Sequence, residues 1–96
     1  MSDEQLHKII INYMQVYKPE RISLFGSFAR GDNNEESDID ILIRLQETCS
    51  LFQLVRIEND LSELIGRKVD LVTEGAIKNE RIRKSIQQDL QVIFEA

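Results

Sequence analysis

The sequence predicts an α/β domain, in which a small sheet is covered by helices. Three short apolar runs, at residues 21–25, 38–44 and 68–73, have the length of strands. They alternate with longer stretches whose apolar residues recur every three or four positions, as they do in amphipathic helices. This alternating order favours the α/β class. With 96 residues, the chain is expected to form a single domain over residues 1–96 with one modest core.

The first helix is expected over residues 4–17, because its apolar residues fall on one stripe. They are Leu6, Ile9, Ile10, Tyr13, Met14 and Tyr17. Ser2 and Asp3 are candidate caps, and Pro19 ends the helix. The first strand, at 21–25, then runs directly into Gly26-Ser27 and a short helical turn.

The second strand, over residues 38–44, alternates in a way that separates its two faces. Ile39 and Ile41 point to one side, whereas Asp38 and Asp40 point to the other. We therefore expect one face to pack on the core and the other to begin with two acids that face a cleft. The polar residues 31–37 before it are typical of a loop.

The remaining elements are a helix, a strand and a helix, followed by an apolar segment. Ser50 is a candidate cap for a helix over 50–65, and Gly66 is a natural stop. The third strand covers 68–73 and carries Asp70. A third helix is expected over 76–88, and residues 90–94 form a closing segment that is extended or part of a final turn. The inward residues of the third helix are expected to be Ile77, Ile82 and Ile86.

Composition narrows the classes of function. The net charge of −5 argues against a general nucleic-acid binder, although a nucleotide remains possible because cations screen its phosphates. The single cysteine, Cys49, allows no internal disulfide, and no signal peptide is recognisable, so a cytoplasmic location is expected. No apolar run approaches the roughly 20 residues of a membrane span.

The junction at Gly26-Ser27 is a candidate phosphate site. Backbone N–H groups at the start of a helix are unpaired and attract anions, and glycine allows close approach to the backbone. The Ser27 hydroxyl is a further donor. An ordinary capped turn is the alternative. A P-loop is disfavoured, because Asp32 stands where its lysine would be.

Asp38, Asp40 and Asp70 are candidate metal ligands. Two carboxylates at i and i+2 raise each other's pKa unless a cation lies between them, and such oxygen ligands suit Mg²⁺ or Mn²⁺. Two ions of this kind can activate an attacking oxygen and stabilise a pyrophosphate leaving group. If the third strand lies beside the second, Asp70 joins the pair and can accept the proton of the attacking hydroxyl. The alternatives are solvated acids, or a salt bridge from Asp70 to Lys68 or Arg44.

Gly26-Ser27, ten residues, and then Asp38-Ile39-Asp40 resemble the signature of the DNA polymerase β-like nucleotidyltransferases. Asp70 lies where that superfamily has its third carboxylate. The stretch 26–31 followed by Ser37 to Asp40 is especially similar to the minimal nucleotidyltransferases, or MNT proteins. The resemblance covers essentially the whole chain. It implies the nucleotidyltransferase fold, with a small mixed sheet.

The resemblance also implies a mechanism and a partner. Many MNT proteins act as antitoxins that transfer AMP from ATP to a tyrosine of a HEPN-domain RNase toxin. By this analogy Asp38 and Asp40 hold Mg²⁺, Asp70 completes the catalytic site, and the triphosphate is bound by Gly26 and Ser27 with assistance from Arg30. A chain of this size has little surface with which to grip an acceptor, so a partner that brings its own acceptor fits it. Neither a membrane nor direct nucleic-acid binding is expected.

Two other functions stay open at this point. The first is an antitoxin that acts by binding alone. The second is a nucleotidyltransferase that acts on a small molecule or on RNA. Candidate surfaces for the partner are residues 92–94 and the outer face of the helix from Leu51 to Ile65, with core packing as the alternative. The basic residues Lys78, Arg81, Arg83 and Lys84 are a further candidate contact, with a solvated helix face as the simpler interpretation.

Overall fold

A single mixed sheet organises the chain. The computed structural model describes residues 2–31 and 38–96, apart from the side chains of Ser27 and Arg30. Within these residues, the strands lie in the order β3-β2-β1-β4. β1 (Pro19–Phe25) is antiparallel to β2 (Ile39–Leu45) and to β4 (Gln91–Glu95), whereas β2 is parallel to β3 (Val69–Thr73). The expected α/β class and mixed sheet are confirmed.

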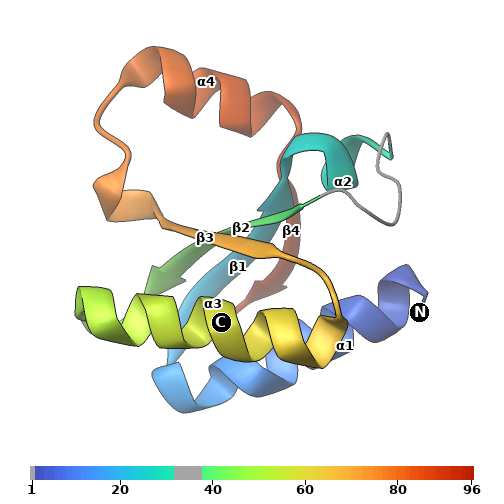
Figure 1. The fold of residues 1–96 in the computed structure, drawn as a ribbon. Helices are drawn as coiled ribbons and strands as arrows, with labels where there is room; N and C mark the ends of the chain where they lie inside the picture. Colours follow the sequence, from blue (N-terminus) through green and yellow to red (C-terminus); the bar gives the residue numbers. More distant parts are fainter. Residues whose placement is uncertain (1, 32–37) are drawn as a thin grey trace.

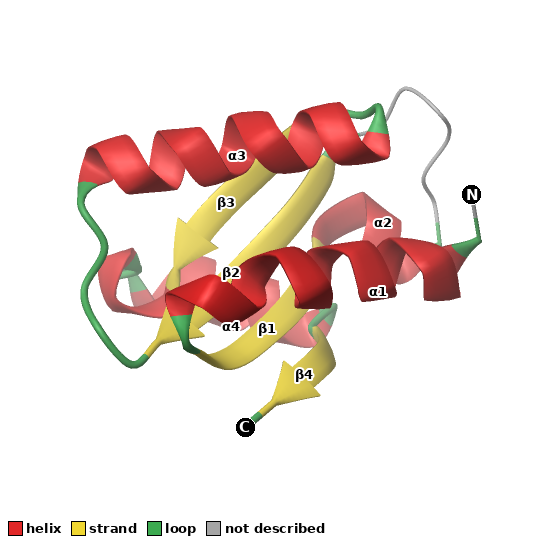
Figure 2. Cartoon of the chain, turned by 90° about the horizontal axis from the view of Figure 1, so that it is seen from below, coloured by secondary structure: helices red, strands yellow, loops and turns green. Residues whose placement is uncertain are grey.

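Two helices cover one face of this sheet and enclose the core. α1 (Asp3–Met14), which continues as a 3-10 turn at Gln15–Tyr17, lies beside α3 (Leu51–Ile65), as Figures 1 and 2 show. The large apolar side chains with no exposed surface come from these helices, β1 and β2: Ile10, Met14, Ile22, Leu24, Ile39, Ile41, Ile43, Ile57 and Leu61. The odd-numbered isoleucines of β2 therefore face the core, as their alternation predicted.

Both long helices begin with the same capping arrangement. The hydroxyl oxygen of Ser2 accepts a hydrogen bond from the backbone N–H of Gln5, and the Gln5 side chain accepts one from the N–H of Ser2. Ser50 and Gln53 repeat this capping box at the start of α3. Gly66 ends α3 in the left-handed conformation, with φ of 78°. These boundaries agree with the predicted caps and stop.

The helix expected over 76–88 is shorter than predicted. A 3-10 turn at Glu74–Ala76 precedes α4 (Glu80–Gln88), which lies over the face of the sheet opposite to α1 and α3 (Figure 1). α4 begins late because the side-chain oxygen of Asn79 caps it, accepting from the backbone N–H groups of Arg81 and Ile82. None of its residues is buried, and Ile82, which was expected to point inward, is 54% exposed.

The other boundaries differ only slightly from the prediction. β1 begins at Pro19, and α2 (Gly26–Arg30) follows it without an intervening loop. The closing segment is a strand, β4, which pairs with β1. Among the described helices, none has both the length and the apolar character needed to cross a membrane.

Candidate active site

Asp40 and Asp70 are neighbours across the sheet. β2 and β3 pair in parallel with Asp40 directly opposite Asp70, and the next pair along is Ile41 with Leu71. Neighbouring strands lie about 4.8 Å apart, and residues in register present their side chains on the same face. Both aspartates are half-buried. The predicted neighbourhood of the second and third strands is therefore confirmed, and it places two carboxylates side by side.

Asp38 lies just before β2 and has a different neighbour. Its Oδ2 atom is 3.9 Å from the Nζ atom of Lys68, in an ion pair at the surface. Lys68 immediately precedes β3, and its carbonyl oxygen accepts a hydrogen bond from the N–H of Ile39. This backbone bond aligns the starts of the two strands and brings the Lys68 side chain to Asp38 rather than to Asp70.

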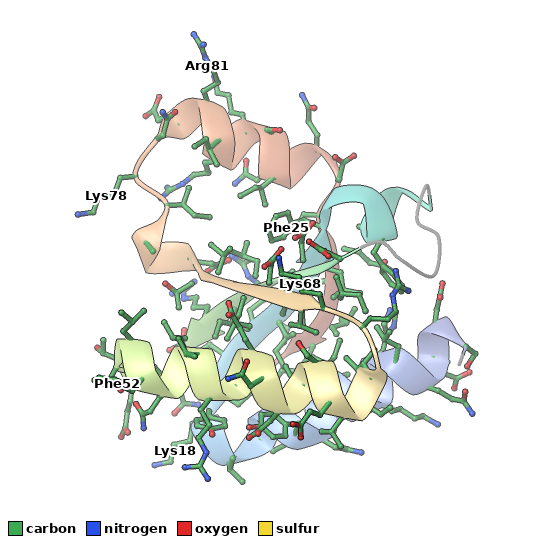
Figure 3. The ribbon with its side chains drawn as sticks, viewed as in Figure 1. Lys18, Phe25, Phe52, Lys68, Lys78 and Arg81 are labelled. Atoms are coloured by element: carbon green, nitrogen blue, oxygen red, sulfur yellow. The ribbon has the colours of Figure 1, made fainter. Side chains whose placement is uncertain are left out.

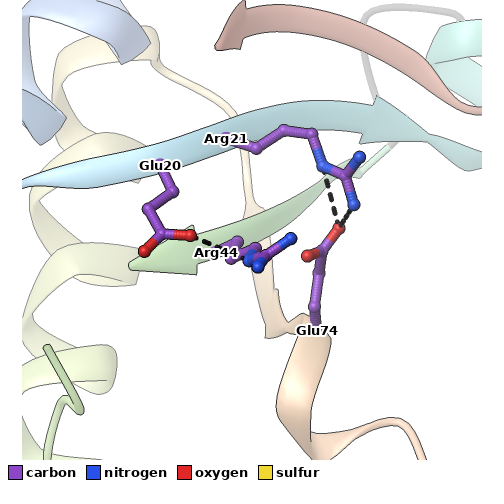
Figure 4. A network of polar contacts seen from close by, with 4 residues as sticks. All are labelled: Glu20, Arg21, Arg44 and Glu74. Carbon is purple, nitrogen blue, oxygen red and sulfur yellow. Dashed lines mark hydrogen bonds and ion pairs between the residues drawn. The ribbon is translucent and has the colours of Figure 1, made fainter. Parts of the chain in front are cut away.

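The salt bridge considered as an alternative for Asp70 is not present. Lys68 pairs with Asp38, and the Nε atom of Arg44 lies 2.9 Å from a carboxylate oxygen of Glu20 (Figure 4). Within residues 2–31 and 38–96, no group of three His, Cys, Asp or Glu side chains is arranged to hold a metal ion. The structure thus brings Asp40 and Asp70 together as a pair, and the three-acid metal site stays a prediction.

Gly26 is in direct contact with one member of this acid pair, Asp40. Phe25, the last residue of β1, is opposite Asp40 in the β1–β2 register, so Gly26 begins α2 beside the Asp40 carboxylate. A Cβ atom on residue 26 would overlap Oδ2 of Asp40 and lie 3.3 Å from its Cγ atom. Gly26 also has φ of 74°, which side chains disfavour. Only glycine fits here, and the start of α2 therefore lies against the carboxylate of Asp40.

The other two predicted nucleotide contacts belong to α2. Ser27 and Arg30 are both in this five-residue helix, but their side chains lie outside the described part of the chain. The position of the helix itself is fixed by Phe28, which is 7% exposed and belongs to the core. The guanidinium carbon of Arg67 lies 5.6 Å from the centre of the Phe28 ring. α2 is therefore anchored independently of Ser27 and Arg30.

The acids share their side of the sheet with Leu42, as the alternation along β2 implies, and with an ion pair that sequence reasoning missed. Leu42 is two residues beyond Asp40 on β2 and points to the same side, toward α4. Arg21 of β1 is hydrogen-bonded and ion-paired to Glu74, which lies just after β3 (Figure 4). This pair could not be predicted from the sequence, because Arg21 and Glu74 are 53 residues apart and no local pattern connects them.

Comparisons with known proteins agree with this geometry. Residues 7–93 match the family model described as the nucleotidyltransferase domain. A Methanocaldococcus jannaschii protein, MJ1217, which is provisionally named a protein adenylyltransferase, is 49% identical over 84 residues, covering 88% of this chain and 84% of its own length. Protein adenylyltransferase MntA of Thermococcus cleftensis is 41% identical over 58 residues, covering 60% of this chain and 59% of its own.

Solved structures share the fold. A protein provisionally described as a minimal nucleotidyltransferase superposes with a TM-score of 0.77 at 29% identity, covering 95% of both chains. A chain from a complex of a tri-AMPylated HEPN toxin with an MNT antitoxin from Shewanella oneidensis gives 0.80 at 18% identity, covering 99% of this chain and 74% of its own. A chain from a toxin–antitoxin complex with AMP-PNP gives 0.84 at 22% identity, with coverage of 94% and 73%.

The mixed sheet, with a glycine turn packed on an acid pair, defines an enzyme of the nucleotidyl-transferring class. The chain belongs to the nucleotidyltransferase family, as its match over residues 7–93 shows. The resemblance noted from the Gly-Ser and Asp-x-Asp motifs is thereby confirmed.

Proposed function

We propose that the chain is a protein adenylyltransferase that transfers AMP from ATP to a hydroxyl of a HEPN toxin and acts as its antitoxin. The observation that carries this proposal is the contact of Gly26 with Asp40, beside Asp70. It puts a glycine turn, against which phosphates can lie, next to two carboxylates. The relatives named protein adenylyltransferase, and the structural neighbour in complex with an AMPylated HEPN toxin, support the choice of substrate.

The reaction joins the acceptor oxygen to the α-phosphorus of ATP. That P–O bond forms as the bond from the α-phosphorus to the oxygen leading to the β-phosphate breaks, and diphosphate leaves. The acceptor hydroxyl loses its proton, which we assign to the carboxylate of Asp70 at the edge of the pair. The products are the AMP ester of the acceptor and diphosphate. We propose a tyrosine as the acceptor residue.

The acid pair is suited to a divalent cation. Like charges directly opposite each other on neighbouring strands repel, and Asp40 and Asp70 occupy such positions. Carboxylate oxygens are the ligands that Mg²⁺ and Mn²⁺ prefer. Asp40 and Asp70, joined by Asp38, would hold the cation, which when bound stabilises charge on the phosphates and lowers the pKa of the attacking hydroxyl. Gly26, Ser27 and Arg30 are assigned to the triphosphate.

The proposal includes the partner and the compartment. Transfer requires an acceptor hydroxyl held in line with the α-phosphate, and a folded partner that carries its own acceptor can present it in this way. Cys49, the one cysteine in the sequence, fits a protein of the reducing cytoplasm.

A labelling assay tests the proposal. The chain is mixed with Mg²⁺, ATP labelled at the α-phosphate, and the product of the adjacent gene. We expect label on that product, and we expect the double variant Asp38→Asn, Asp40→Asn to give none. Glu63→Gln, which removes an exposed acid from α3, is the matched control and should label as the parent does.

Two results would overturn the proposal. A toxin that carries no label, yet is inhibited equally by the parent and by the double Asn variant, identifies an antitoxin that acts by binding alone. Label found on RNA or on a small molecule, with no protein in the reaction, identifies a different acceptor class.

A further inference from the structure

We propose that the cavity between the sheet and α4 binds the acceptor segment of the protein substrate, with Arg83 recognising a carboxylate close to the acceptor hydroxyl. This inference rests on the proposed function and deepens it. The cavity has a volume of about 410 Å³ and is lined in part by Arg21, Leu42, Glu74, Arg83, Ile86 and Leu90.

β2 links the cavity to the acid pair, because it carries a residue of each. Leu42, on the cavity floor, is two residues from Asp40 and points to the same side of the sheet. Residues at i and i+2 of a strand lie about 7 Å apart, which is the spacing between alternate residues of an extended peptide. A segment that places its hydroxyl at Asp70 therefore places a nearby side chain over Leu42.

The underside of α4 offers apolar surface that the fold does not use. Ile86 of α4, together with Leu90 just beyond the end of the helix, lines the cavity; both are only half-buried, and α4 buries none of its residues. Helices in small domains are normally held by an apolar face packed on the core. Here that face covers a cavity, so an apolar side chain of the substrate has a place between Leu42 and Ile86.

The charge at this cavity selects an acidic segment. Arg83 lines the cavity, and the one hydrogen bond that its side chain makes to a described residue is donated to the carbonyl oxygen of Ile77 at 2.7 Å. A guanidinium has five N–H donors, so most of those on Arg83 are open to a ligand. Arg21, in contrast, is already paired with Glu74.

A matched pair of charge reversals tests this inference. Arg83→Glu changes the cavity, whereas Arg81→Glu makes the same change on the same helix at a side chain that points away from the body of the protein (Figure 3). The probe is the adjacent-gene product that the parent chain labels. We expect Arg83→Glu to raise the KM for this acceptor and thereby to lower kcat/KM at least 10-fold. Arg81→Glu should change kcat/KM less than 2-fold. The dissociation constant for ATP with Mg²⁺ should be unchanged in both variants.

A second pair tests the apolar surface. Ile86→Asp alters the cavity lining, and Ile82→Asp alters an isoleucine of α4 that is 54% exposed and does not line it. Only Ile86→Asp should raise the KM for the acceptor. Thermal melting of each variant and of its matched control shows whether a raised KM comes from the altered cavity or from an unfolded protein.

The outcomes distinguish the inference from the proposed function. If the parent labels no protein, the proposed function fails and this inference fails with it. If the parent labels its partner while Arg83→Glu and Ile86→Asp match their controls, the proposed function stands and the acceptor cavity is overturned. If these variants weaken binding of ATP and leave the KM for the acceptor unchanged, the cavity holds the nucleotide and the inference is likewise overturned.

Discussion

The backbone of Gly26 is packed against the carboxylate of Asp40, so closely that a Cβ atom on residue 26 would overlap Oδ2 of Asp40. These two residues are 14 positions apart in sequence, and the pairing of β1 with β2 brings them together. The contact couples the start of α2, assigned to phosphate, to the acid assigned to the cation. A change at either residue should therefore act on the other.

Gly26→Ala should abolish AMP transfer. The new Cβ atom would push the Asp40 carboxylate out of place, and the positive φ of residue 26 adds backbone strain of roughly 1–3 kcal/mol. Gly66→Ala is the control, since Gly66 has a similar φ of 78° and no described atom lies within 4 Å of its added Cβ. It should lose stability and keep activity. Label transfer and denaturant unfolding measure the two effects, and equal activity of both variants would contradict the contact.

Removal of one acid should stabilise the protein in the absence of metal. Asp40 and Asp70 repel each other across β2 and β3, so Asp70→Asn should raise the free energy of unfolding by about 0.2–1 kcal/mol in EDTA. Mg²⁺ at ten times its dissociation constant should stabilise the parent by about 1.4 kcal/mol. It should stabilise Asp70→Asn much less. Melting curves with EDTA and with Mg²⁺ test this, and an equal response of the two proteins to Mg²⁺ would remove Asp70 from the cation site.

The elements that sequence predicted best are those fixed by local signals. Ser50 and Gly66 bound α3 because a capping box and a left-handed residue act over a few positions. The glycine turn was recognisable because a strand pattern stops at Gly26. α4 was misjudged, since the cap at Asn79 overrides the apolar spacing that suggested a start at residue 76. The direction of the Ile82 side chain depends on how α4 packs on the sheet, which no local sequence pattern specifies.

The candidate site was only partly predictable, because its geometry depends on strand pairing. Alternation placed Asp38 and Asp40 on one face, but only the parallel pairing of β2 with β3 sets Asp70 opposite Asp40. The ion pair of Lys68 with Asp38 likewise follows from that register, and the sequence alone did not predict it. The cavity under α4, with Arg83 at its lining, arises from the placement of a helix over the sheet, on which the sequence is silent.

Tyr13 should make stability depend on pH in the alkaline range. Burial, together with the hydrogen bond that its hydroxyl donates to Asp60, raises the pKa of Tyr13 above its ordinary value of about 10. Above pH 10 the unfolded chain loses this proton while the folded chain retains it. The contribution of Tyr13 to stability is therefore complete below about pH 10 and is lost as the pH rises through the folded-state pKa.

Tyr13→Phe measures that contribution. At neutral pH the variant loses a hydrogen bond to a half-buried carboxylate, so it should be less stable by about 1.5–3 kcal/mol. The difference from the parent should shrink above pH 10, because the parent alone then loses stability through this group. Urea unfolding at pH 7, 10 and 11 gives the difference directly. A gap between the two proteins that stays constant with pH would contradict the link between Tyr13 and Asp60.

Ser23→Ala and Ser62→Ala should change stability in opposite directions, although each removes one hydroxyl. Ser23 of β1 has no exposed surface, and its Oγ atom has no hydrogen-bond partner among the described residues, so the folded state bears the cost of desolvating it. Its removal should raise the free energy of unfolding by about 1 kcal/mol.

The hydroxyl oxygen of Ser62 instead accepts from the N–H of Val69 at 3.0 Å, and its removal leaves the first residue of β3 without that partner. That variant should lose about 1–3 kcal/mol. Urea unfolding of both variants at one pH measures these changes. A lower free energy of unfolding for Ser23→Ala would mean that its hydroxyl is hydrogen-bonded to a water or a ligand on the side of the sheet that faces α4.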